Sequence, residues 1–200
     1  MIIFDLDGTL LYTLEDLHAS TNFALESEGL PARSLDEVRR FVGNGIRKLI
    51  ERAVPDGCAP DVTDRVFAAF KRHYAENCMV LTQPYPGIPE MLDALKARGW
   101  KLGVVSNKAD EPVKALIAHY FPGVFDSVVG ERENVRKKPA PDSVFETVGS
   151  LGCDIGQAVY IGDSDVDGQT AANAGCDCVL VSWGFRGRET LLPFGCPIAD

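Results

Sequence analysis

The spacing of hydrophobic positions changes near residue 84 and divides the chain into two regions. From residue 13 to residue 82, apolar side chains such as Leu14, Leu17 and Leu25 recur every three or four positions, as in amphipathic helices. A capping box, Ser34–Glu37, begins one of these helices, and Gly43–Asn44–Gly45 interrupts the pattern. We therefore expect a small bundle of helices in this region, without strands.

The rest of the chain alternates short apolar runs with helical segments. The runs, which are too short to be helices, are Ile2–Phe4, Leu102–Val105, Ser127–Val129, Ala158–Ile161 and Cys178–Val181. Strands that are apolar on both faces and joined by helices are typical of a parallel sheet. The first run needs the later strands as partners, because an isolated strand is not stable. The expected fold is therefore α/β, a Rossmann-like parallel sheet with an inserted α-helical domain.

This pattern predicts two domains, a sheet domain of residues 1–12 and 83–200 and a helical domain of residues 13–82. Lys and Arg number 20 against 29 Asp and Glu, a net charge of −9, which disfavours nucleic acid or an anionic membrane surface as the main partner. The six cysteines have neither paired nor metal-binding spacing, so we expect reduced thiols. The sequence shows no leader-like or long apolar segment, and we expect a cytoplasmic protein.

Polar side chains follow the expected strands at the carboxyl ends, where parallel sheets bind ligands. They are Asp5 and Asp7 after the first strand, Ser106 and Asn107 after the second, Asp163 after the fourth, and Lys138 in a loop. Carboxylates that meet at one edge repel one another unless a cation lies among them, and hard oxygen ligands favour Mg2+. Lys138 and the Ser106 hydroxyl would then bind an anion, most simply a phosphate. The set indicates phosphoryl transfer to a carboxylate nucleophile.

These motifs occur in the order found in a known family. Asp5-Leu6-Asp7-Gly8-Thr9, Ser106-Asn107, Lys138-Pro139 and Gly162-Asp163-Ser164-Asp165-Val166-Asp167 together resemble the four motifs of the haloacid dehalogenase-like hydrolase superfamily. The resemblance spans the whole chain, and the helical insertion is similar to the cap domain of these enzymes. More narrowly, Val42–Ile46, Ser106–Lys108 and Trp183–Arg186 resemble segments of phosphoglycolate phosphatases.

The resemblance implies roles for the matching residues. Asp5 would be the nucleophile, and Asp7 would be the general acid and base. The residues implied in binding the substrate phosphate are Thr9, Ser106, Asn107 and Lys138. The residues implied in binding Mg2+ are Asp5, Asp7 through its backbone carbonyl, Asp163, and Asp167 directly or through water. Tyr12 departs from the pattern, because the family often has a carboxylate there, at the hinge of the cap.

The glycine-rich segment of the helical domain has two interpretations. Gly43, Asn44 and Gly45 could form a loop, rich in hydrogen-bond donors, that faces the substrate, with Arg47 near enough in sequence to bind a substrate carboxylate. Alternatively, the glycines are only a helix break that needs a positive φ, and Arg47 makes a surface salt bridge.

The residues and the resemblance together imply Mg2+-dependent hydrolysis of a small phosphomonoester through an aspartyl-phosphate. The resemblance makes 2-phosphoglycolate the favoured substrate, and we expect a monomer or homodimer. Two alternatives stay open. One is β-phosphoglucomutase-like phosphoryl transfer, which needs the same Asp5 and Asp7, and the other is a catalytically silent binding module. A dehalogenase is disfavoured, because it needs neither Mg2+ nor a carboxylate at position 7.

Overall fold

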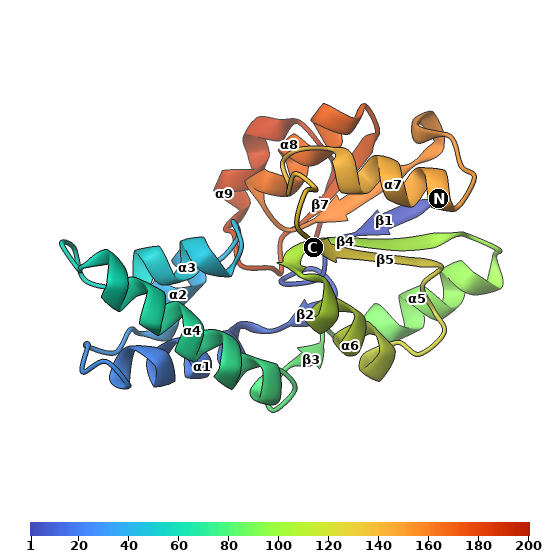
Figure 1. The fold of residues 1–200 in the computed structure, drawn as a ribbon. Coiled ribbons are helices and arrows are strands. Elements are labelled where there is room, and N and C mark those ends of the chain that lie inside the picture. The colour runs from blue at the N-terminus through green and yellow to red at the C-terminus, as the bar shows by residue number, and fades with distance from the viewer. The chain divides into compact units, whose positions relative to one another are not determined.

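The computed structural model describes residues 1–200, and they divide into two compact units (Figure 1). The sheet unit comprises Met1–Tyr12 and Pro84–Asp200, and the helical unit comprises Thr13–Gln83. Where the chain passes from one unit to the other, β2 (Leu11–Tyr12) pairs with β3 (Gln83–Pro84) in a two-stranded sheet. No helix combines the length and the apolar character that crossing a membrane requires.

The sheet unit is built on a six-stranded sheet in the order β5-β4-β1-β6-β7-β8. The strands are β1 (Ile2–Phe4), β4 (Leu102–Ala109), β5 (Ser127–Glu131), β6 (Val159–Gly162), β7 (Asp177–Val181) and β8 (Ile198–Ala199). Every neighbouring pair is parallel. The first strand is central, since Ile2 lies opposite Leu102 on one side and Val159 on the other. The predicted α/β class with a parallel sheet is confirmed.

Helices cover both faces of this sheet, with α5 and α6 on one face and α7 and α8 on the other (Figure 1). The helices of the unit are α5 (Ile88–Ala97), α6 (Asp110–Tyr120), α7 (Asp142–Ser150), α8 (Asp165–Ala174) and α9 (Arg188–Leu191), with short 3-10 turns η1 (Ile155–Gln157) and η2 (Leu192–Phe194). Under α7 and α8, the buried core includes Ile3, Val105, Val144 and Ala171. This apolar packing fixes the strands, and therefore the loops at their carboxyl ends, in place.

The helical unit contains α1 (Leu14–Glu26), α2 (Leu35–Phe41), α3 (Ile46–Ala53) and α4 (Pro60–Asn77). At the start of α2, the Ser34 amide donates to Glu37 Oε2 at 2.8 Å and the Glu37 amide donates to Ser34 Oγ at 3.3 Å, which forms the capping box that the sequence indicates. Leu25, Val38 and Phe70 are buried and supply part of the core of this unit.

A buried carboxylate joins the two ends of the helical unit. Asp16 on α1 is only 2% exposed. Its carboxylate accepts hydrogen bonds from the amides of Val80 at 3.1 Å, Leu81 at 2.9 Å and Thr82 at 2.9 Å. These amides follow α4 and lie outside regular structure, so without Asp16 they would need other acceptors. The contact therefore holds the end of the segment against its beginning.

Candidate active site

The loop after β1 carries the two predicted carboxylates. Asp5 follows the strand directly, and its amide donates to Ile161 O on β6 at 2.8 Å. The loop then turns through Gly8, whose φ of +86° favours glycine. A Cβ at Gly8 would also lie 2.4 Å from Asp163 Oδ2, which is closer than packing permits. A glycine at this position lets the loop approach Asp163 while Asp5 stays at the end of its strand.

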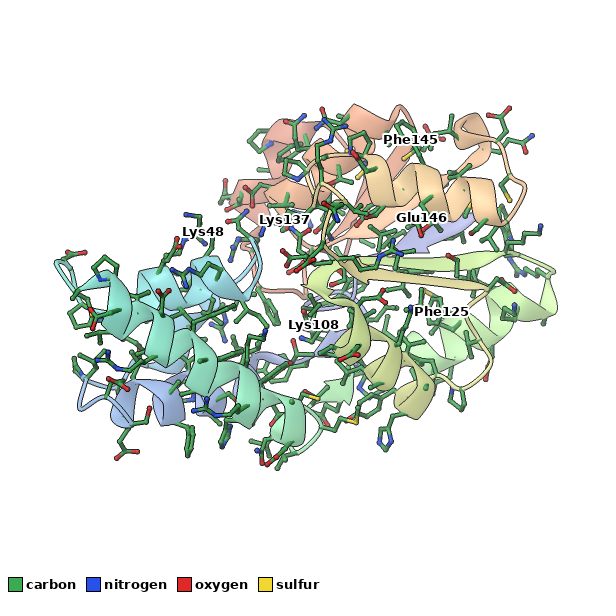
Figure 2. The ribbon with its side chains drawn as sticks, in the orientation of Figure 1. Lys48, Lys108, Phe125, Lys137, Phe145 and Glu146 are labelled. Atoms are coloured by element: carbon green, nitrogen blue, oxygen red, sulfur yellow. The ribbon has the colours of Figure 1, made fainter.

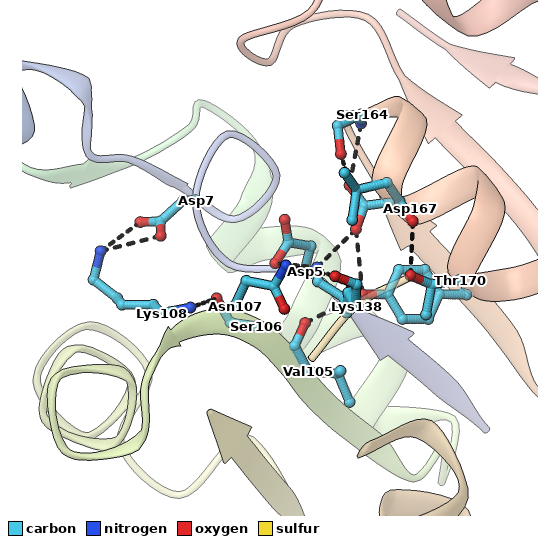
Figure 3. Close-up of polar contacts among 12 residues, drawn as sticks. Asp5, Asp7, Val105, Ser106, Asn107, Lys108, Lys138, Ser164, Asp167 and Thr170 are labelled. Atoms are coloured by element: carbon cyan, nitrogen blue, oxygen red, sulfur yellow. Dashed lines mark hydrogen bonds and ion pairs between the residues drawn. The ribbon is translucent and has the colours of Figure 1, made fainter. Parts of the chain in front are cut away.

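Lys138 lies among buried polar groups contributed by different elements (Figure 3). Its Nζ is 2.8 Å from Asp5 Oδ1 and 2.7 Å from Asp167 Oδ1, and it donates to the Tyr160 hydroxyl at 3.0 Å. Burial by itself would lower the pKa of Lys138, but Asp167 and Asp5 raise it well above its ordinary value. Lys138 is therefore an ammonium, whereas the neighbouring Lys137 lies at the surface and pairs with Glu131 (Figure 2).

Asp5 and Asp167 share the Lys138 ammonium, and a third buried carboxylate, Asp163, lies close to both. Oxygens of Asp5, Asp163 and Asp167 all lie within 4.8 Å of one another. Burial raises the pKa of Asp5 to about 7, and the charge of Lys138 opposes that shift. Burial, together with Asp167 and Asp5, raises the pKa of Asp163 well above its ordinary value. The group therefore carries more negative charge than its protein partners compensate, which suits a hard divalent cation.

Asp163 is held by a backbone amide of the loop after β7, and Asp167 is held by Ser164, the residue before α8. Asp163 Oδ2 accepts from the Phe185 amide at 2.6 Å, and a Cβ at Gly184 would lie 2.2 Å from Asp163 Cβ. Asp167 accepts from the Ser164 amide at 3.1 Å and from Ser164 Oγ at 2.6 Å. Both carboxylates therefore have little freedom to rotate.

The second motif lies inside a strand rather than in a loop. β4 continues to Ala109, with a register shift against β5 between Val105 and Ala109. Asn107 Nδ2 donates to Lys138 O at 3.0 Å, so this amide holds the backbone of the lysine loop. Ser106 Oγ accepts from the Lys108 amide at 3.2 Å.

Thr9 supplies a further polar group to this part of the sheet unit. The residue is 1% exposed, and its Oγ1 has no hydrogen-bond partner within the protein. A buried hydroxyl without a partner is costly, so the position suits a ligand that accepts a hydrogen bond.

Asp7 is separate from the carboxylate group. Its side chain points to Lys108 rather than to Asp5 (Figure 3), and Lys108 Nζ donates to both carboxylate oxygens, at 2.8 and 3.1 Å. Lys108 was not among the residues expected at the site, although a lysine directly after a polar pair on a buried strand was a signal for one. Tyr160 was not expected there either, and its hydroxyl donates to Val105 O at 3.2 Å beside Lys138.

The predicted residues of the helical unit have partners within that unit. Gly43 and Gly45 have φ values of 126° and 84°, which favour glycine. Asn44 Oδ1 accepts from Arg52 Nη2 at 2.8 Å. Arg47 pairs with Glu51 at 3.0 Å and Asp64 at 2.6 Å. The surface salt bridge considered for Arg47 is therefore present, and a role in substrate binding stays a prediction.

Tyr12, the position that departs from the family pattern, packs within the sheet unit. Its ring meets Tyr85 edge-on at a centroid distance of 5.9 Å and Phe185 at 6.4 Å. An aromatic contact thus occupies the position at which the resemblance led us to expect a carboxylate. Phe185 also gives its amide to Asp163, so the contact extends to a residue beside the carboxylates.

The chain is similar to known proteins over almost its whole length. A model of the haloacid dehalogenase-like hydrolase family matches residues 2–181. The phosphoglycolate phosphatase of Aquifex aeolicus is 36% identical over 194 residues, which are 96% of this chain and 89% of that protein. A crystal structure from Lactobacillus delbrueckii has a TM-score of 0.94 at 36% identity and covers 100% of this chain and 93% of that one. A predicted phosphoglycolate phosphatase from Haemophilus somnus has a TM-score of 0.92 at 31% identity, with coverage of 100% and 93%.

Proposed function

The chain belongs to the haloacid dehalogenase-like hydrolase family, and we propose that it is a Mg2+-dependent phosphatase that hydrolyses a small phosphomonoester, with 2-phosphoglycolate as its substrate. The observation that carries the proposal is the buried group of Asp5, Asp163, Asp167 and Lys138 at the carboxyl edge of the sheet. The substrate is proposed from the name of the Aquifex aeolicus relative, which is 36% identical to this chain.

The donor set fits Mg2+. Asp5, Asp163 and Asp167 offer only hard oxygen atoms, and no histidine or cysteine belongs to the group. When bound, Mg2+ supplies positive charge that offsets the carboxylates and draws electron density from the phosphoryl group. Asp7 contributes no side-chain oxygen to this group, so its proposed contribution to the metal is its backbone carbonyl.

Asp5 is the proposed nucleophile. One of its carboxylate oxygens attacks phosphorus and forms an aspartyl-phosphate, while the bond from phosphorus to the ester oxygen breaks. Asp7, in its acid form, gives a proton to that leaving oxygen and afterwards takes a proton from the water that attacks the aspartyl-phosphate. Inorganic phosphate leaves, and the Asp5 carboxylate is restored.

The other residues of the sheet unit bind and orient the phosphoryl group. Lys138 holds Asp5 by charge, and although its three N–H groups face Asp5, Asp167 and Tyr160, the positive charge of the ammonium also attracts the phosphoryl oxygens. The hydroxyls of Thr9 and Ser106 are further donors to these oxygens, and Thr9 Oγ1 has no competing partner within the protein. Asn107 acts mainly on the Lys138 loop, because its Nδ2 is already bonded to Lys138 O.

We propose that the domain of residues 13–82 serves as a cap and that Gly43, Asn44, Gly45 and Arg47 contact the end of the substrate far from its phosphate. Gly45→Val is expected to raise the KM for 2-phosphoglycolate about tenfold, since the bulk closes a loop that backbone donors line. Arg47→Ala is expected to have a smaller effect, because Glu51 and Asp64 already share the guanidinium. Turnover of p-nitrophenyl phosphate, which has no carboxylate, is the control and changes much less.

The test of the proposed function is a panel of phosphomonoesters, assayed for free phosphate with Mg2+ and with a chelator. We expect release of phosphate only with Mg2+ and the highest kcat/KM for 2-phosphoglycolate. Full activity in chelator would contradict the metal site. Conversion of β-glucose 1-phosphate to glucose 6-phosphate, instead of phosphate release, would assign the protein to phosphoryl transfer between substrates.

A further inference from the structure

The pair of Asp7 and Lys108 brings a buried cation next to the proposed acid. Lys108 lies on β4 and its side chain is 2% exposed, while that of Asp7 is 17% exposed. Because Lys108 Nζ donates to both oxygens of Asp7, the carboxylate faces the ammonium and not the carboxylate group around Asp5. Asp7 therefore has to turn away from Lys108, and its carboxylate has to take up a proton from solvent, before it can act as the acid at the ester oxygen of a substrate at Asp5.

That movement would leave the ammonium without this partner. Removing one member of a buried ion pair is strongly destabilising, because the remaining charge has little access to water. The cost of turning Asp7 is lowered when another anion takes its place at Lys108. Any such anion has to lie close to the ester oxygen, since Asp7 moves from one to the other by rotation of a short side chain.

The leaving group of 2-phosphoglycolate carries an anion, its carboxylate, close to the ester oxygen. A single methylene separates its carboxylate from the ester oxygen that Asp7 is to protonate. A group within hydrogen-bond distance of the resting Asp7 is therefore within reach of this carboxylate. An alcohol leaving group without a charge offers Lys108 no such partner.

We propose that Lys108 is a specificity-determining residue that binds a second anionic group of the substrate, a carboxylate next to the phosphate ester, and that this group replaces Asp7 as the partner of the ammonium. The inference rests on the proposed function and deepens it, since it names a second substrate contact in the sheet unit. Substrate binding then frees the residue that transfers the proton, so a substrate without the second anion reacts slowly even when its phosphate binds.

The test compares 2-phosphoglycolate with ethyl phosphate, in which a methyl group stands in place of the carboxylate. The wild-type enzyme is expected to have a higher kcat/KM for 2-phosphoglycolate, and Lys108→Met is expected to reduce that preference about 10- to 100-fold, the range of a charged hydrogen bond. Lys108→Arg is expected to keep most of the preference. Lys137→Met is the matched control, because Lys137 is an exposed lysine paired with Glu131, and it should keep the wild-type preference.

A second measurement tests the inference even if the Lys108 variants do not fold. Asp7→Asn removes the competing carboxylate, so the dissociation constant of 2-phosphoglycolate should fall about fivefold relative to that of ethyl phosphate in calorimetry. Equal losses on both substrates in Lys108→Met, with no such gain in Asp7→Asn, would overturn the inference. Loss of the preference in Arg47→Ala and not in Lys108→Met would also overturn it. A wild-type enzyme that hydrolyses neither ester would instead contradict the proposed function.

Discussion

Asp16 and Asp5 are both buried carboxylates, but the groups around them differ in kind. Asp16, in the helical unit, accepts hydrogen bonds from three backbone amides. Asp5, in the sheet unit, shares the Lys138 ammonium with Asp167 and has Asp163 close by. Amide dipoles that converge on one carboxylate can stabilise its charge without a cation. A single ammonium cannot neutralise three neighbouring carboxylates.

This contrast shows that burial of a charge is not by itself a sign of function. The Asp16 carboxylate accepts enough hydrogen bonds to stabilise its charge, and it links the two ends of the helical unit. The carboxylates around Asp5 are held close in spite of their repulsion, a cost that suits a site which binds a cation and a phosphoryl group. The following four predictions test whether the two regions respond differently to the same kind of substitution, from Asp to Asn.

Asp5→Asn is expected to have the largest effect, a fall in kcat of about 10⁴-fold or more, because an amide is a poor nucleophile. The chain should still fold, since the change removes a charge from a repelling group. Intact mass after rapid quenching should show a phosphorylated wild-type enzyme and no phosphorylated variant. A phosphoryl group found on Asp163 instead would mean that the proposed roles are wrong.

Asp7→Asn is expected to slow turnover about 10²- to 10⁴-fold, because proton transfer to the leaving oxygen and from water is lost. Pre-steady-state kinetics should show both half-reactions slowed. Asp165→Asn is the control, since the Asp165 side chain is 53% exposed and 3.7 Å from Arg186. Equal losses in the two variants would remove the argument for Asp7 as acid and base.

Asp16→Asn is expected to lower the free energy of unfolding by about 2 kcal/mol, since an amide keeps one acceptor oxygen and turns N–H groups toward amides that also donate. Urea denaturation measures this loss. The kcat of the folded fraction should remain close to that of the wild type. A large fall in kcat without a loss of stability would mean that Asp16 is not the structural carboxylate described here.

Asp163→Asn is expected to change the free energy of unfolding least, and to raise it where Asp16→Asn lowers it. In chelator, its free energy of unfolding should rise by about 1 kcal/mol, because one of three mutually repelling carboxylates is gone while an oxygen remains to accept from the Phe185 amide. Added Mg2+ should stabilise the wild type by mass action but have little effect on the variant. A variant less stable than the wild type in chelator would show that the carboxylates do not repel as proposed.

Sequence order and parallel topology together were sufficient to place several site residues. Asp5 and Asp163 follow neighbouring strands, β1 and β6, so pairing of the strands brings the carboxylates to one edge. Lys108 could not be placed in this way, because Ser106–Lys108 has the composition of a loop, whereas β4 runs through it to Ala109. Tyr160 has the pattern of a core residue, and only the structure shows that its hydroxyl lies beside Lys138.

The short edge strand was also missing from the predicted fold. β8 has two residues, too few to form a hydrophobic pattern, and its pairing depends on backbone bonds from Leu180 N to Pro197 O and from Ser182 N to Ala199 O. Pairing through backbone hydrogen bonds does not require particular side chains, so it produces no pattern in the sequence. Central strands can therefore be found from apolar residues, but this edge could not.

The central place of β1 sets an order for synthesis on the ribosome. Ile2 emerges from the ribosome long before its partners Leu102 and Val159 are translated. At ordinary elongation rates of about 5–20 residues per second, the strand therefore waits several seconds or longer for them. Thr13–Gln83, by contrast, is a continuous segment that forms one compact unit. We expect protease to spare these residues in chains arrested after about 130 residues, while residues 1–12 become resistant only once β6 has emerged. The start of the chain, which carries the proposed nucleophile, is thus among the last parts to become native.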